Sequence, residues 1–249
     1  MRLVLGILVV ALGVACDSAS AREVGEWTEL IKGEGMEGWK KPTGEWLQVG
    51  EAVKDPANER AIATKPGKGI LVNGAKGRTG NLFTEEQFGD IEAHIEFMIP
   101  KGSNSGVYFM GRYEIQVYDS FGVAKGAYPG IECGGIYERW DPKRKPPGFE
   151  GHSPRVNASK APGEWQSFDV QFLAPRFDAE GKKVANARFL LVKHNGEIVH
   201  QNVDLTGPTR AAAFNDEKPA GPLMFQGDHG PVAYRNLLVR PFAAQSAAK

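Results

Sequence analysis

Glycine and proline recur along nearly the whole chain and divide it into short segments rich in β-branched and aromatic residues. The chain has 31 glycines and 16 prolines in 249 residues. In the clearest segment, residues 90–99 (DIEAHIEFMI), apolar and polar residues alternate. Strict alternation indicates a strand with one buried face. Short strands of this kind, separated by turn residues, predict an all-β sandwich or barrel, and no helical period persists along the sequence.

Other segments complete the predicted set of strands. They lie at residues 107–110, 113–118, 167–173, 187–195, 198–203, 223–225 and 232–240. Residues 101–106 (KGSNSG) predict a turn, and residues 111–112 a two-residue hairpin connection, because Gly111 tolerates positive φ. Residues 138–165, dense in proline, glycine and charge, are too long for an ordinary connection and predict a binding loop or lid. We therefore expect residues 22–242 to form one β-sandwich domain.

The N-terminus predicts export. Residues 1–21 combine a basic residue, an apolar run too short to span a bilayer, and small residues at the end. Cleavage after Ala21 would release the chain, whereas lipidation of Cys16 would anchor it, although Gly13 stands where a lipobox usually has leucine. We expect a periplasmic or extracellular protein that meets a membrane only through such an anchor, with residues 243–249 as a disordered tail.

Charge and cysteine content exclude several classes of protein. Thirty basic and thirty acidic residues cancel, which argues against a nucleic-acid-binding protein, since such proteins present excess positive charge to phosphates. After removal of the leader, Cys133 is the only cysteine, so internal disulfides and cysteine-ligated zinc are excluded. The expected state of Cys133 is a small buried thiol.

The predicted strand at residues 113–118 has one polar face. Glu114, Gln116 and Tyr118 alternate with apolar residues, so they share a side. This face is either solvated or part of a concave substrate surface. Sandwich enzymes that hydrolyse β-glucans directly need two carboxyl groups at close spacing. Here the second carboxylate is missing unless Asp119 turns inward.

Histidines offer further candidates. Glu92, His94 and Glu96 share one strand face and could bind a divalent cation, but a solvent-facing stripe is the favoured interpretation. No serine stands in a nucleophile-elbow pattern, and no phosphate-binding glycine loop is present in the sequence. The remaining histidines outside the C-terminal loop have no partner that spacing identifies and are interpreted as surface or internally satisfied residues: His152, His194 and His200.

A glycine-rich loop near the C-terminus carries polar residues between two apolar strands. Gln226, Asp228 and His229 lie in this loop, where the glycines allow a tight turn. Histidine suits proton transfer because its unperturbed pKa is near neutrality. In the alternative interpretation, Asp228 accepts hydrogen bonds from turn amides and His229 only caps the core.

Several long segments resemble one family, the 3-keto-disaccharide hydrolases. They include FGDIEAHIEFMIPKGSNSGVYFMGRYEIQVYDSFG, CGGIY, KAPGEWQSFDVQFLAPRFD, HNGEIVHQNVDLTGPT and DHGPVAYRNLLVRP, and in family order they cover residues 27–241. The resemblance implies a concanavalin A-like jelly roll of two antiparallel sheets with a concave sugar-binding face. One departure is Gly227, since the family pattern LQDHG reads FQGDHG here, and this loosens the register of Gln226.

The resemblance also implies cleavage of glycosides already oxidised to a ketone at carbon 3. The ketone acidifies the hydrogen at C2, so a base can remove it, the glycosidic oxygen leaves by β-elimination, and water adds to the enone. From this chemistry we expect Glu114 to be the base, His229 the proton donor to the leaving group and Arg112 the enolate stabiliser. Residues expected to bind the sugar are Asn104, Gln116, Tyr137, Gln226 and Trp140.

Partners and alternatives follow from the same resemblance. Asp119 and Asp228 are expected to orient Arg112 and His229, respectively. No cofactor is required, although a divalent cation held by Glu96 or Glu114 remains open. The substrate is an oligosaccharide or glycoside supplied by a glycoside 3-oxidoreductase. The alternatives are a non-catalytic carbohydrate-binding module, an ordinary endoglucanase, and a structural or adhesion domain.

Overall fold

The computed structural model describes residues 25–33, 35–124 and 130–242. The predicted export signal with Cys16 and the predicted tail at 243–249 lie outside the described residues. Within these ranges every regular element is a strand, and no helix is long and apolar enough to cross a membrane. The all-β prediction is confirmed.

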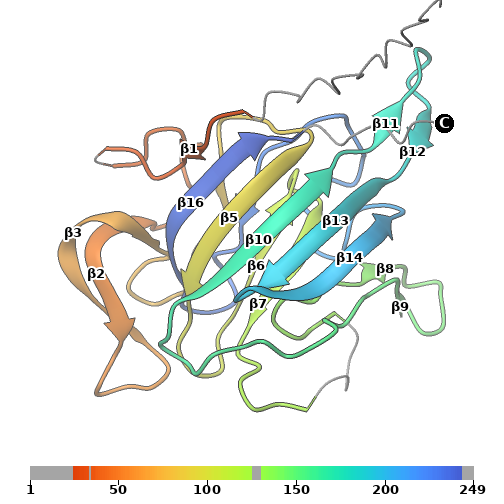
Figure 1. The fold of residues 1–249 in the computed structure, drawn as a ribbon. Coiled ribbons are helices and arrows are strands. Elements are labelled where there is room, and N and C mark those ends of the chain that lie inside the picture. The colour runs from red at the N-terminus through yellow and green to blue at the C-terminus, as the bar shows by residue number, and fades with distance from the viewer. Residues whose placement is uncertain (1–24, 34, 125–129, 243–249) are drawn as a thin grey trace, which may run out of the picture.

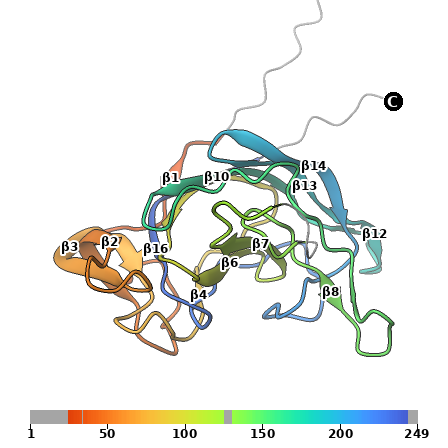
Figure 2. The same ribbon diagram turned by 90° about the horizontal axis from the view of Figure 1, so that it is seen from below.

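The strands form two main antiparallel sheets (Figure 1). Their bounds are β1 (Thr28–Glu29), β2 (Leu47–Lys54), β3 (Ile62–Val72), β4 (Leu82–Phe83), β5 (Ile91–Met98), β6 (Asn104–Phe109), β7 (Tyr113–Tyr118), β8 (Arg139–Trp140), β9 (Gly148–Phe149), β10 (Gln166–Leu173), β11 (Arg176–Phe177), β12 (Lys183–Ala185), β13 (Ala187–His194), β14 (Glu197–Leu205), β15 (Met224–Phe225) and β16 (Ala233–Pro241). The large sheet has the order β14-β13-β10-β5-β16-β3-β2, with β1 also on β16, and the small sheet has the order β4-β15-β6-β7. Figure 2 shows the large sheet arching over the small one, which confirms the predicted jelly-roll sandwich.

The core lies between the two sheets. Alternate residues of β5 point inward, as the sequence predicts, and Ile95 and Phe97 are fully buried. From the small sheet, Phe109 packs against Phe172 and Phe189, with ring centroids 5.2 and 5.3 Å apart. Buried aromatic side chains contribute large apolar areas and favour tilted or edge-to-face contacts such as these. This packing holds β6 and β7 under the large sheet.

The β6–β7 hairpin differs from its prediction in two ways. The strand β6 already begins at Asn104, so the second half of the predicted turn at 101–106 is part of the strand. The connection is the three-residue segment Met110–Gly111–Arg112, in which Met110 and Gly111 have φ of 57° and 63° and the Arg112 amide donates to Phe109 O at 3.0 Å. Because Asn104 is part of the strand, its side chain joins the alternation of β6.

The long segment at 138–165 is fastened to the rest of the domain. It contains the β8–β9 pair, and its hydrogen bonds to the large sheet and its connections include the following three. The Arg155 amide donates to Val199 O at 3.0 Å, Asn195 Nδ2 to Ala158 O at 2.8 Å and the Gly163 amide to Ile99 O at 2.8 Å. These contacts fix its path along the large sheet.

Candidate active site

The polar face of the small sheet lies on the side away from the core. In the β6–β7 register, Asn104 pairs with Tyr118, Gly106 with Gln116, and Tyr108 with Glu114, so these side chains share that face. Ile115 and Val117 between them are fully buried in the core, as alternation predicts. The polar residues are not solvated, however: Glu114 is 1% exposed and Gln116 is 3% exposed.

Several oxygen atoms on this face lack a hydrogen-bond partner. Among the described residues, Asn104 Oδ1, Glu114 Oε2 and Gln116 Oε1 are buried and unpartnered. A buried acceptor without a donor costs about 1–3 kcal/mol, and native structures keep few of them. Three unpartnered acceptors on the β6–β7 pair make this face a candidate for binding a ligand rich in hydroxyl donors.

Glu114 has an ionisation suited to proton transfer. Burial raises its pKa to about 8, the hydrogen bond from Tyr108 lowers it, and the negative charge of Asp228 raises it. The carboxyl group therefore exchanges a proton near neutral pH, where general acids and bases work best. The same influence shows that Asp228 lies near Glu114.

Tyr108 belongs to the site although the sequence reasoning did not select it. It is fully buried, and its hydroxyl can donate either to the Glu114 carboxyl or to Arg210 O, which lies 3.4 Å away. Burial and the Glu114 charge raise the pKa of its hydroxyl well above the ordinary value, so it stays protonated. The sequence could have indicated Tyr108, because it alternates with Asn104 and Gly106 and so shares their strand face. The prediction of a turn at 101–106 left that alternation unrecognised.

The glycine-rich loop packs against the start of β6. The Gln226 amide donates to Gly106 O at 2.9 Å, and Ser105 Oγ donates to Gln226 O at 2.8 Å. A side chain at Gly230 would lie 2.9 Å from the Asn104 amide, so only glycine allows this approach. The loop therefore brings its polar residues to the edge of the candidate site.

His229 and Asp228 form a pair in that loop. Nδ1 of His229 lies 2.6 Å from Oδ1 of Asp228, and both side chains are about half exposed. Asp228 is thus in contact with the His229 ring, and its orienting role stays a prediction. Held at Nδ1, the imidazole keeps Nε2 for proton transfer.

Arg112 has partners other than those predicted. Its guanidinium donates through Nε to Asp216 O, through Nη2 to Asp216 Oδ1 at 2.8 Å, and through Nη1 to Met110 O at 2.8 Å. The carboxylate that holds Arg112 is therefore Asp216, whereas Asp119 accepts from the Gly102 amide at 2.7 Å. The reason is the three-residue hairpin connection, which places Arg112 at the end of the hairpin beside the 214–216 segment.

Tyr137 and Trp140 lie at another edge of the polar face. The Tyr137 amide donates to Glu114 O at 3.2 Å, and its half-buried side chain is close enough to feel the Glu114 charge. Trp140 is 43% exposed, and the Arg210 guanidinium lies 3.9 Å from the centroid of its ring. Arg210 also hydrogen-bonds the Tyr137 side chain. No sequence pattern announced Arg210, because it reaches this site from the connection after β14.

A comparison with known protein families identifies the family of this chain. Residues 26–240 match the family described as the 3-keto-alpha-glucoside-1,2-lyase-like domain. The chain belongs to this family. The recognition made from the sequence is thereby confirmed, and membership in the 3-keto-alpha-glucoside-1,2-lyase-like family places the chain among carbohydrate-active proteins.

Solved structures support the fold of this 3-keto-alpha-glucoside-1,2-lyase-like domain. Two proteins of Parabacteroides distasonis ATCC 8503, assigned as glycosyl hydrolases, are similar to it. The first is 24% identical, with a TM-score of 0.60 over 87% of this chain and 84% of the other. The second is 17% identical, with a TM-score of 0.56 over 87% of this chain and all of the other. No curated protein matches the chain.

Other polar groups of the lyase-like domain give no sign of a second site. Among described residues no group of three or more histidine, cysteine, aspartate or glutamate side chains could hold a metal. Burial lowers the pKa values of His194 and His200 to about 4, and each ring bonds through Nε2, to Gln166 and Gly134 O. Cys133 is a free buried thiol, as predicted, and burial raises its pKa to about 12.

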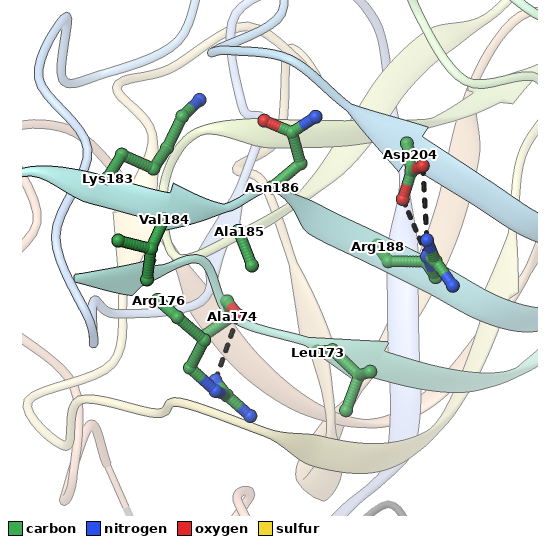
Figure 3. Close-up of a pocket in the computed structure, with 9 residues that line it drawn as sticks. All are labelled: Leu173, Ala174, Arg176, Lys183, Val184, Ala185, Asn186, Arg188 and Asp204. Carbon is green, nitrogen blue, oxygen red and sulfur yellow. Dashed lines mark hydrogen bonds and ion pairs between the residues drawn. The ribbon is translucent and has the colours of Figure 1, made fainter. Parts of the chain in front are cut away.

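A separate hollow lies elsewhere in the domain. It has a volume of about 430 Å³ and is lined at the β11–β14 end of the large sheet by residues that include Arg176, Lys183 and Arg188 (Figure 3). Arg188 is paired with Asp204, with Nε and Oδ1 2.6 Å apart, and Lys183 is paired with a glutamate outside the lining. None of the predicted site residues lines it. Its charges are neutralised, so we place the candidate site on the small sheet.

Proposed function

We propose that the protein cleaves glycosides whose sugar carries a ketone at carbon 3. The observation that carries the proposal is the buried carboxyl of Glu114, which has one free oxygen on a face of unpartnered acceptors, in a chain of the 3-keto-alpha-glucoside-1,2-lyase-like family. Asn104 and Gln116 accept hydrogen bonds from sugar hydroxyls. Such acceptors destabilise the fold while they lack a donor, and they favour ligands whose hydroxyl groups supply one.

In the proposed reaction, ionised Glu114 takes the C2 proton through its free Oε2. The C2–H electrons form the enolate, which collapses to a C1–C2 double bond as the C1–O bond breaks. His229, fixed by Asp228, gives a proton to the leaving oxygen. Water then adds its oxygen to C1 and a proton returns to C2, so the net change is hydrolysis. A base and a positioned acid each contribute about 10²- to 10⁴-fold.

The stabiliser of the enolate differs from the initial prediction. The guanidinium donors of Arg112 are used by Asp216 and Met110, and no interaction between Arg112 and the Glu114 carboxyl accompanies the raised pKa of Glu114. The Tyr137 hydroxyl, backed by Arg210, is beside Glu114 and is the donor that we assign to this role. The expected binding roles of Gln226 and Trp140 are kept in the proposal.

A second candidate function has one observation in its favour. The Asp228 charge raises the pKa of Glu114, and two interacting carboxyl groups are the arrangement of ordinary glycosidases. In that case Glu114 would be the acid and Asp228 the base or nucleophile, and the unoxidised glycoside would be the substrate. A carbohydrate-binding module is the non-catalytic alternative, for which turnover of any substrate is not expected.

A substrate panel separates these functions. The purified mature protein is incubated with a 3-keto-glucoside, its unoxidised parent and laminarin, and the released aglycone or reducing sugar is followed. Turnover of the ketone alone, with deuterium appearing at C2 when the reaction runs in D₂O, supports elimination. Ketone substrate in D₂O without the protein measures spontaneous exchange. Turnover of the parent or of laminarin contradicts the proposal and supports direct hydrolysis.

The proposal also has consequences for the cellular setting. A 3-keto sugar must be made by oxidation of a secondary hydroxyl, so a glycoside 3-oxidoreductase is the functional partner. We propose that both act outside the cytoplasm, as the predicted export signal requires. No cofactor is part of the proposed reaction, and unchanged turnover after treatment with a chelator is the result expected if no divalent cation takes part.

A further inference from the structure

Gly106 and Tyr108 stand directly around the Glu114 carboxyl. Gly106 lies opposite Gln116, one pair along from the Tyr108–Glu114 pair, so the Glu114 side chain leans diagonally across β6. A Cβ atom at Gly106 would lie 2.0 Å from Glu114 Oε1 and 2.9 Å from Cδ. The carboxyl therefore occupies the space that any other residue at 106 would fill.

The glycine is not needed for backbone conformation. Its φ is outside the left-handed region, so alanine could adopt the same backbone. The atom that alanine would displace is the end of a flexible side chain. Gly106→Ala should therefore fold and move the Glu114 carboxyl alone.

Tyr108, the direct cross-strand partner of Glu114, contacts the same carboxyl. Its hydroxyl has two possible acceptors, the Glu114 carboxylate and Arg210 O at 3.4 Å. A hydroxyl has one proton to donate and two lone pairs. It can therefore donate to ionised Glu114, and after Glu114 takes a proton it can accept from that carboxyl and donate to Arg210 O. One tyrosine holds the carboxyl in both states.

We infer that Gly106 and Tyr108 are positioning residues, which hold one oxygen of Glu114 over β6 and leave Oε2 free to exchange a proton with the substrate. This inference rests on the proposed function for its chemistry, and on the packing around Gly106 for its geometry. It adds two residues that act through Glu114 and need not touch the reacting sugar.

The groups that face Glu114 predict opposite responses to substitution. Tyr108 lowers the pKa of Glu114 through its hydrogen bond and Asp228 raises it through its charge, while Tyr137 lies beside it and Tyr234 lies behind the sheet. Removal of the Tyr108 hydroxyl should raise the Glu114 midpoint, and removal of the Asp228 charge should lower it. A merely structural residue would move it in neither direction.

The test is a carboxyl titration of the full mature protein by ¹³C NMR, with the Glu114 signal assigned from its loss in Glu114→Gln. We expect a higher midpoint in Tyr108→Phe and in Gly106→Ala, and a lower one in Asp228→Asn. Gly89→Ala, a glycine with ordinary φ whose Cβ would meet only Pro219 O at 3.2 Å, is the matched control and should leave the midpoint unchanged. Unchanged midpoints in both Gly106→Ala and Tyr108→Phe would overturn the inference.

Activity provides the second readout. On the 3-keto-glucoside, Gly106→Ala should lower kcat about 100-fold with little change in KM, as expected for a misplaced catalytic group. The double variant with Tyr108→Phe should be no worse than Gly106→Ala, since both act on one carboxyl. If no ketone substrate turns over but the midpoints shift as stated, the proposed function fails while the positioning stands. Midpoints that stay fixed while the ketone turns over reject only the positioning.

Discussion

Polar residues alternate with core residues on both β5 of the large sheet and β7 of the small sheet. The two strands differ in whether their polar atoms have hydrogen-bond partners. On the large sheet, Glu92, His94 and Glu96 of β5 have cross-strand partners. Arg240 pairs with Glu92, Arg235 Nε lies 2.6 Å from Glu96 Oε2, and Asp169 Oδ1 lies 2.6 Å from His94 Nδ1. The predicted stripe is thus a partly exposed ladder of ion pairs.

The small sheet presents the opposite case. Its polar residues are more deeply buried than those of β5, yet the acceptor oxygens of Asn104, Glu114 and Gln116 have no donor among the described residues. Polar atoms that stabilise a fold are paired, whereas polar atoms reserved for a ligand remain unpaired until it binds. Sites of this kind are maintained at a cost in stability.

The largest expected effect is the loss of activity in Glu114→Gln. Because Gln cannot accept the C2 proton, kcat on a 3-keto-glucoside should fall about 10²- to 10⁴-fold, with folding retained. The measurement is steady-state turnover, with circular dichroism as the check on folding. Glu96→Gln is the matched control on the other face and should keep full activity. Equal losses in the two variants would remove the distinction between the faces.

The pH dependence of stability should also differ between Glu114 and its Gln variant. The pKa of Glu114 is about 8 in the folded chain against 4.5 as the ordinary value, so folding retains a proton between these limits. Stability from this group is complete below the ordinary pKa and is lost as pH rises through the folded pKa. The unfolding free energy of the wild type should fall by up to about 1.4 kcal/mol per pH unit relative to Glu114→Gln in that window.

Urea unfolding of both proteins from about pH 5 to about pH 9 measures this difference. Parallel curves for the two proteins would show that Glu114 ionises in the folded state as it does in an unfolded chain. Such a result would contradict a desolvated carboxyl on the small sheet.

Gln116→Leu should gain stability and lose affinity. The substitution removes a buried acceptor without a donor, which is worth about 1 kcal/mol or more in unfolding free energy, and places an apolar side chain of similar size. The same acceptor is proposed to hold a sugar hydroxyl, so KM should rise about tenfold while kcat changes less. A variant that loses stability would show that Oε1 of Gln116 is satisfied in the free protein.

The smallest effect is expected on the ion-pair ladder. Asp169 raises the pKa of His94 through a hydrogen bond, with smaller help from Glu96. The stabilisation is therefore present below the ordinary pKa of 6.5 and is lost as pH rises through the raised value. Since both partners are partly exposed, Asp169→Asn should lower the unfolding free energy by less than about 1 kcal/mol at pH 6. At pH 9 the loss should be smaller still. Thermal unfolding measures it, and activity should not change.

The strand pattern of the sequence determined much of the fold. Alternation within residues 90–99 and 113–118 correctly assigned the buried and polar sides of β5 and β7, because the side-chain period of a strand is two wherever one face is buried. The same alternation placed Glu114 and Gln116 on one face. The expectation that Cys133 is a small buried thiol is also confirmed.

Only the tertiary structure decided which polar face is functional. Sequence spacing does not distinguish the Glu92 stripe from the Glu114 face. It does not show that arginines of β16 pair with the stripe, or that connections far along the chain bury the Glu114 face. Tyr108, Arg210 and the Arg112–Asp216 pair depend on contacts between residues far apart in the chain. Desolvation, which raises the pKa of Glu114, arises only when such segments pack together, and no local pattern records it.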